Sequence, residues 1–173
     1  MLEQLKLDLP NFPTEILSDW LLPLAELKGW PASQHDDKLL EGSWRYLLLS
    51  KPLKFWRNVK WKKIDRHISI YDLDKKYQEG CTNIVLGAVK GQKSLYTIFM
   101  PNLAETFYNI VNHIKDNGTL PKPPIILRRK TGLHILDGNH RMSAYLYCYG
   151  YFNLDVDPKL KISAKEIQSY WMA

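Results

Sequence analysis

Five consecutive residues of this chain combine groups that bind phosphate and groups that move protons. They are Asp137, Gly138, Asn139, His140 and Arg141, within "HILDGNHRMSAYLYCYG". The apolar run before them predicts a strand and the run after them a helix, so the motif opens a helix. Free N–H groups and a partial positive charge at a helix N-terminus attract anions. Gly138 lets the backbone approach an oxygen closely, because glycine has no Cβ.

The side chains of this motif suit the same purpose. Arg141 offers a planar fork for two phosphate oxygens. His140 can donate a hydrogen bond to those oxygens or transfer a proton near neutral pH. Asp137, at the end of the strand, can hold Mg²⁺ or accept a proton from a hydroxyl. The alternative is structural: Asp137 or Asn139 is an ordinary N-cap, and the other side chains are solvated.

Regular elements are predicted on either side of the motif. A helix is expected over about 103–117, with Asn102 as N-cap, Glu105 as its capping-box acid and Gly118 at its end. The strands "IILRR" and "LHIL" follow, and the motif helix runs from about Asn139 to Gly150. We also predict strands at "NIVLGAV" and "SLYTIFM", separated by a turn containing Gly91, and a strand over 152–162. Residues 164–172 are predicted as a helix with Ser163 as N-cap.

The run "NHIKDNGTLPKPPIILRRKTGLHILDGNHRMSAYLYCYG" resembles the core of the ParB/sulfiredoxin superfamily. A helix, a proline bend, two strands and a D/G-G-x-H/R-R motif follow one another in that order. The resemblance covers about residues 98–160. It implies an α/β (α+β) fold with a small mixed sheet, preceded by a mainly helical segment. We therefore expect a single domain over 1–173, with an N-terminal elaboration over 1–80 and the core over 81–173.

The resemblance also implies a function. Gly138, Asn139, His140 and Arg141 would hold the phosphates of ATP or another nucleoside di- or triphosphate. The closest motif match is to the free serine kinases, which carry "DGHHR". By that similarity Asp137 and His140 are catalytic, and Glu105 is a candidate base. Asp137 is also the candidate ligand for Mg²⁺, and a small hydroxyl-bearing molecule is the candidate phosphoryl acceptor.

Two other members of the superfamily are similar only in part. ParB proteins hydrolyse CTP but carry a helix-turn-helix domain, for which this chain has little length after the motif. Sulfiredoxins place a cysteine where this chain has Asn139. Neither Cys81 nor Cys148 is placed by the motif to replace that cysteine. The resemblance therefore favours a Mg²⁺-dependent phosphotransferase or a nucleotide hydrolase.

The composition is that of an ordinary globular protein, with 173 residues, of which 45% are hydrophobic. Two distant cysteines indicate neither a disulfide framework nor a zinc site. The first residues lack the pattern of a signal peptide, and no apolar run is long enough to span a bilayer. We expect a cytoplasmic protein without a membrane partner.

Positive charge is concentrated in one stretch. Residues 45–66 hold eight basic side chains and one acid, a net +7 in a chain whose total is +6. Cations interleaved with aromatics can bind single-stranded DNA or RNA by neutralising phosphates and stacking bases. This surface would comprise Lys54, Trp56, Arg57, Lys60, Trp61, Lys62 and Lys63. The alternative is that the tryptophans pack into the core and the lysines are solvated, which we favour because no recognised nucleic-acid motif accompanies the charge.

Overall fold

A computed structural model describes residues 1–30, 42–152, 154 and 166–173 of the chain. These residues form two compact units, 1–62 together with Ala173, and 63–172. The division therefore falls between Lys62 and Lys63, whereas we expected one domain with an internal boundary near residue 80. All of the candidate phosphate site lies in the second unit.

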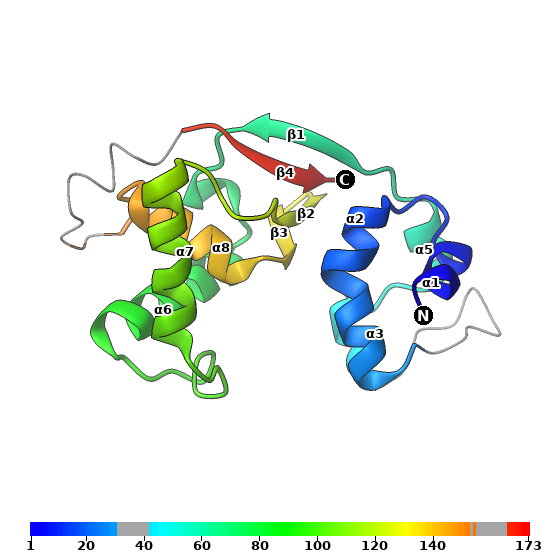
Figure 1. The fold of residues 1–173 in the computed structure, drawn as a ribbon, viewed down its shortest axis with the longest axis horizontal. Helices are drawn as coiled ribbons and strands as arrows, with labels where there is room; N and C mark the ends of the chain where they lie inside the picture. The colour runs from blue at the N-terminus through cyan, green and yellow to red at the C-terminus, as the bar shows by residue number, and fades with distance from the viewer. Residues whose placement is uncertain (31–41, 153, 155–165) are drawn as a thin grey trace. The chain divides into compact units, whose positions relative to one another are not determined.

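The first unit is helical, as predicted for the segment broken by prolines (Figure 1). Its elements are α1 (Leu2–Asp8), α2 (Thr14–Ile16), the π-helical turn η1 (Leu17–Leu21), α3 (Leu22–Lys28), α4 (Gly42–Leu47) and α5 (Leu53–Arg57). Pro13 and Pro52 precede α2 and α5, where a missing N–H costs no helical hydrogen bond. Its core contains Leu5, Leu9, Ile16, Leu17, Trp20, Leu21 and Trp56.

The second unit combines helices with a four-stranded mixed sheet, which confirms the α/β fold class. In chain order it contains β1 (Lys62–Arg66), the 3₁₀ turn η2 (Ile70–Asp72), α6 (Lys75–Lys90), α7 (Leu103–Asn117), β2 (Ile125–Arg129), β3 (Gly132–Asp137), α8 (Asn139–Cys148) and β4 (Gln168–Met172). The strand order is β1-β4-β2-β3. β2 is antiparallel to β3 and parallel to β4. The predicted strand pair and the predicted motif helix are thus confirmed.

Helix α8 lies at the centre of this unit, where α6 and α7 both pack against it (Figure 1). Every residue from Met142 to Cys148 is buried. The core around α8 is completed by buried side chains of α6 and α7, namely Tyr77, Cys81, Ile84, Val85, Ala88, Phe107, Val111 and Ile114. No helix in the described part of the chain is long and apolar enough to cross a membrane.

The strands predicted at "NIVLGAV" and "SLYTIFM" are wrong. Residues 83–89 belong to α6, and residues 95–99 form turns. The buried positions of α6 recur at helical spacing from Tyr77 onward, and the Asp74 carboxylate caps the helix by accepting from the Lys76 N–H at 3.1 Å. Gly80 does not end the helix. Its bare Cα makes room for the ring of Tyr96, which a Cβ would approach to 3.1 Å.

The helix predicted over 164–172 is wrong for its described residues, because residues 168–172 form the strand β4. Gln168, Tyr170 and Met172 are buried and the residues between them are half-buried, which is the alternation of a strand. The Gln168 side chain accepts from the Leu120 N–H at 2.8 Å and donates to the Gly118 carbonyl at 3.0 Å. Ser163 and most of the strand predicted over 152–162 lie outside the described residues.

The capping box predicted for α7 is also wrong. Asn102 has a left-handed backbone, with φ of 55°, and its side chain caps no N–H group. The helix itself is confirmed, and it ends at Gly118, whose φ is 71°.

The β2–β3 turn provides a test of the packing of this unit. Gly132 has a φ of +130°, and a Cβ there would lie 2.7 Å from the backbone nitrogen of Asp74. Gly132→Ala should therefore lower the free energy of unfolding by more than about 2 kcal/mol, measured by chemical denaturation. Gly91→Ala is the matched control, since Gly91 also has positive φ (+67°) but no atom within 4 Å of the added Cβ. It should cost about 1 kcal/mol. Equal losses would mean that the contact with Asp74 is not rigid.

Candidate active site at the turn from β3 to α8

The candidate site is the sharp turn between β3 and α8. β3 ends at Asp137, Gly138 has φ of 95° and ψ of 27°, and α8 begins at Asn139. The Gly138 carbonyl accepts the first helical hydrogen bond from the Met142 N–H at 2.9 Å. In the described part of the chain no side chain caps α8, and the N-cap residue is Gly138, so neither Asp137 nor Asn139 is the N-cap that the structural alternative requires. The first-turn N–H groups are left without a side-chain acceptor.

An ion pair closes over this turn. An Nη2 proton of Arg141 is donated to Oδ2 of Asp137, four residues earlier. A Cβ on Gly138 would lie 3.0 Å from Nε and Nη2 of Arg141 and 3.1 Å from Cβ of Pro124. Glycine at 138 is therefore what lets the guanidinium lie across the backbone. The side chains of Arg141 and Asp137 remain 13% and 32% exposed, so the pair borders solvent.

His140 and Asn139 complete the turn. Burial lowers the pKa of His140 below its usual value, the Arg141 cation lowers it further, and Asp137 opposes both effects. The imidazole is therefore neutral at pH 7, with one N–H donor and one acceptor. Within the described residues, neither the imidazole nor the Asn139 amide has a hydrogen-bond partner. Both can serve a ligand.

Glu105, the third predicted catalytic residue, is not joined to this turn by any contact. It is exposed in the first turn of α7 and has no hydrogen bond or ion pair to a described residue. No group of three His, Cys, Asp or Glu side chains in the described ranges could hold a metal ion. Asp137 is therefore not part of such a group in the described residues.

The two cysteines are unsuited to nucleophilic chemistry. Cys81 and Cys148 are buried, and burial raises the pKa of their thiols to about 11 and about 12. Thiolate, the reactive form, is therefore scarce at neutral pH. This agrees with the absence of a cysteine from the motif itself.

Trp56 and Trp61 of the basic stretch pack within the first unit. Trp56 is fully buried and donates from Nε1 to the Leu48 carbonyl at 3.2 Å. Its ring and that of Trp61 lie edge-on to Phe12, with centroids 6.2 and 5.2 Å away. Trp56 therefore cannot stack a base without unfolding its surroundings.

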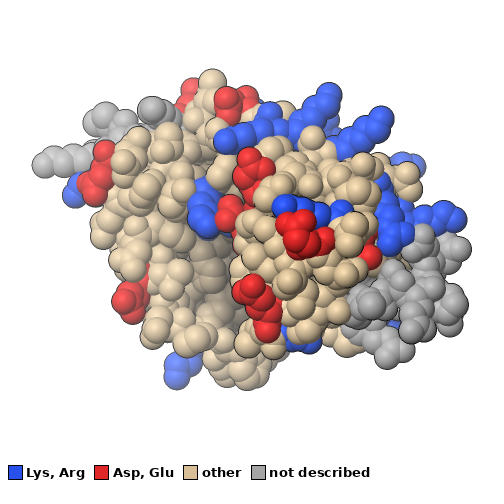
Figure 2. All heavy atoms as spheres, turned by 45° about the vertical axis from the view of Figure 1, so that its right-hand side comes forward, with Lys and Arg blue, Asp and Glu red and all other residues tan. Residues whose placement is uncertain are grey.

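The cations of this stretch have mixed roles. Lys54, Lys60, Lys62 and Lys63 are exposed, whereas Arg57 donates from Nε to the Asp8 carbonyl at 2.7 Å. In the face that Figure 2 shows, acidic side chains lie among the lysines and arginines. The packing alternative is thus confirmed for Trp56, and contact with a polyanion would fall to exposed cations such as Lys60, Lys62 and Lys63.

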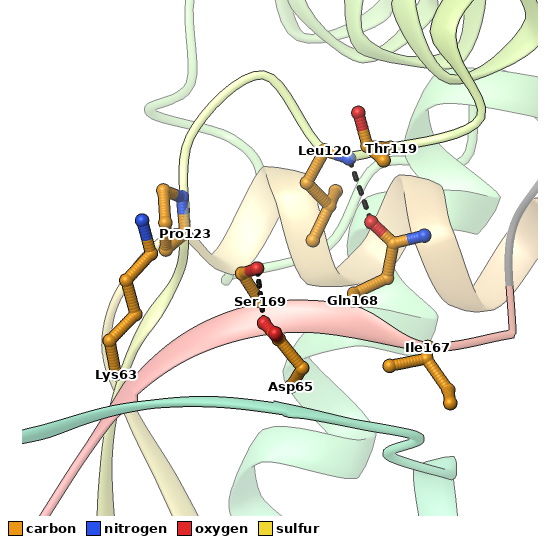
Figure 3. Close-up of a pocket in the computed structure, with 8 residues that line it drawn as sticks. All are labelled: Lys63, Asp65, Thr119, Leu120, Pro123, Ile167, Gln168 and Ser169. Atoms are coloured by element: carbon orange, nitrogen blue, oxygen red, sulfur yellow. Dashed lines mark hydrogen bonds between the residues drawn. The ribbon is translucent and has the colours of Figure 1, made fainter.

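A cavity of about 410 Å³ lies beside β4 (Figure 3). Ser169 of β4 donates to Asp65 of β1 across its wall, and Lys63 lies on the same rim next to Pro123. The Gln168 amide at the far end is occupied by its two bonds to the loop after α7. The Ser169–Asp65 bond thus joins β4 to β1, and the Gln168 bonds join β4 to the loop after α7.

The sequence analysis missed a histidine–tyrosine cluster in the second unit. Nε2 of His67 lies 2.6 Å from the hydroxyl of Tyr151, and Nδ1 lies 3.0 Å from the hydroxyl of Tyr145. Tyr145 donates in turn to the Glu166 carbonyl at 2.7 Å. The one signal in the sequence was the tyrosine-rich run "AYLYCYGYF", since His67 is 84 positions from Tyr151.

A comparison of the chain with protein-family models, with curated proteins and with solved structures finds no significant match. Function must therefore be argued from the geometry of these residues and from the resemblance of the motif.

The burial of Trp56 predicts what its removal does. Trp56→Ala should lower the free energy of unfolding of the first unit by about 3–5 kcal/mol, because it leaves a cavity and removes one of the two hydrogen bonds to the Leu48 carbonyl. Circular dichroism during denaturation measures this loss. Lys60→Ala is the control and should be neutral. If Trp56→Ala left stability intact and weakened oligonucleotide binding, base stacking would be restored as its role.

The lowered pKa of His140 predicts a pH dependence of stability. Unfolded histidine takes up a proton below about pH 6.5, whereas the folded protein resists protonation. The contribution of neutral His140 to the free energy of unfolding should thus be fully present above about pH 6.5. It should decrease as the pH falls below that value. His134, whose pKa burial also lowers, acts in the same direction. Between pH 7.5 and 5.5, urea unfolding of His140→Gln should show a smaller loss than the wild type. An equal loss would show that His140 does not contribute.

Proposed function

We propose that this chain binds a nucleoside di- or triphosphate, with its phosphates on the first turn of α8. The observation that carries the proposal is a helix N-terminus that no side chain caps, directly beside the Arg141 guanidinium. N–H groups of the first turn, the partial charge of the helix and Arg141 all favour an anion at this place. Asn139 and His140 add donors that no described residue uses.

The Asp137–Arg141 pair sets the conditions for binding. Only one guanidinium proton donor is used by Asp137, so the others remain for phosphate oxygens. The Asp137 carboxylate, however, would repel a polyphosphate at this distance. Mg²⁺ commonly binds through one or two carboxylates, phosphate oxygens and waters. We therefore propose that Mg²⁺ enters with the nucleotide and that Asp137 is its protein ligand.

The finer proposal is a phosphotransferase, with hydrolysis as the variant in which water is the acceptor. The terminal phosphoryl group would pass from the nucleotide to a hydroxyl of a small molecule, and the shortened nucleotide would leave. Asp137 would receive the hydroxyl proton, and neutral His140 would donate a hydrogen bond to a phosphoryl oxygen. Such transfer requires mainly positioning and charge neutralisation, which this turn can provide. We assign no step to Glu105.

Polynucleotide binding is the competing proposal, and the exposed lysines 54, 60, 62 and 63 are what support it. It lacks a stacking surface at Trp56 and would depend on charge alone. Its affinity should therefore fall steeply with salt.

Thermal unfolding with ATP, ADP, CTP and GTP, with and without Mg²⁺, tests the nucleotide proposal. A ligand at one hundred times its dissociation constant should add about 2.7 kcal/mol of stability. The shift should require Mg²⁺ and should disappear in Arg141→Ala. Arg129→Ala, which removes an exposed arginine from the same unit, should keep it.

Two outcomes would contradict this assignment. Absence of a shift with every nucleotide would remove the proposed function. A shift that survives in Arg141→Ala but disappears when Lys60, Lys62 and Lys63 are replaced together by alanine would move the phosphates to the basic stretch.

A further inference from the structure

A second cavity, of about 440 Å³, opens on the second unit away from the residues of the phosphate site. Its aromatic side consists of Tyr71 from η2 together with Tyr151 and Phe152, which follow α8. Its polar side is a face of α6 that includes Gln78, Glu79 and Asn83. The volume is within the range of small-molecule sites.

The two tyrosines meet at a right angle. Their ring centroids are 6.4 Å apart and their planes cross at 82°. The hydroxyl of Tyr151 is held by Nε2 of His67 at 2.6 Å, and its ring stacks on Tyr149 with centroids 5.7 Å apart. Tyr151 is therefore fixed in place before any ligand arrives.

Tyr71 is 79% exposed, so burial in the core does not account for its large ring. Its backbone is nevertheless fixed, because Ser69 and Asp72 form a capping box around η2 and Ser69 Oγ accepts from the Tyr71 N–H. The result is an open corner of two aromatic rings on an ordered backbone.

The charge of this cavity is opposite to that of the chain. The protein has a net charge of +6, yet among the described residues neither a lysine nor an arginine lines the cavity, whereas Glu79 does. In the described part of the chain, the Glu79 carboxylate has no hydrogen bond or ion pair. Lys75, one helical turn earlier, lies outside the lining.

We propose that this cavity binds an alkylated ammonium group. Aromatic faces carry partial negative charge and attract a cation placed over them, and methylated ammonium ions are bound between such rings. Glu79, which lines the same cavity, supplies the compensating charge, and the site is independent of the proposed nucleotide function.

Choline and 3,3-dimethylbutan-1-ol, its uncharged isostere, provide the direct test. Binding is followed by NMR through the side-chain amides of Gln78 and Asn83. Choline should shift both amides, and the isostere should bind at least about fivefold more weakly, because it lacks the cation–π attraction. Equal affinity would overturn the proposal, as would the absence of any shift with choline.

Variants of the lining residues show whether choline binds in this cavity. Tyr71→Phe should retain choline binding, whereas Tyr71→Leu and Glu79→Gln should each weaken it by about fivefold or more. Tyr46→Leu is the matched control, since Tyr46 is also 79% exposed but lies in the first unit. Undiminished binding in Tyr71→Leu would overturn the proposal. Arg141→Ala should leave choline binding unchanged even if it abolishes nucleotide binding.

The source of the ammonium group is resolved by adding phosphatidylcholine vesicles. Binding of free choline without sedimentation of the protein on vesicles assigns a soluble ligand. Binding of both assigns a lipid headgroup. Failure of both probes would refute the site.

Discussion

The turn that carries the candidate site is closed by the pairing of Asp137 with Arg141 across Gly138. This contact joins the last residue of β3 to the first turn of α8, and α8 is the buried helix against which α6 and α7 pack. A Cβ at 138 would lie 3.0 Å from the Arg141 guanidinium, which would have to shift. The contact neutralises both charged groups while it uses a single donor of the guanidinium. One local interaction thus fixes the position of the guanidinium relative to the start of α8.

Local patterns were sufficient where an element could be recognised from its own residues. The helix at 103–117, the β2–β3 pair and the motif helix each combine clear periodicity with a glycine that ends or turns the chain. The prediction at α6 failed because "NIVLGAV" has strand-like composition, while the helical face begins earlier, at Tyr77. The prediction for the residues of β4 failed because the partner strands, β1 and β2, are distant in sequence. A nearby serine and glutamate also suggested the start of a helix.

In the candidate site, too, residues that are neighbours in the sequence could be predicted, and residues that are neighbours only in space could not. The motif residues are consecutive, so the sequence alone brought Asp137 and Arg141 together, although not the bond between them. Glu105 was a candidate catalytic base only because of the family resemblance, and no contact in the described residues joins it to the motif. The aromatic corner could not be foreseen, because Tyr71 and Tyr151 come from segments separated by two long helices. Side chains that become neighbours only through tertiary packing leave no local pattern.

The position of β4 has a consequence for synthesis of the chain. Proteins leave the ribosome from the N-terminus, but β4 follows the other three strands of this sheet in the chain and lies between β1 and β2. Until residues 168–172 emerge, β1 has no neighbour in this sheet and the carbonyl of Gly118 has no donor from Gln168. The β2–β3 hairpin and the three helices can form earlier from nearer contacts. Completion of the sheet is therefore expected to follow formation of the β2–β3 hairpin and the three helices.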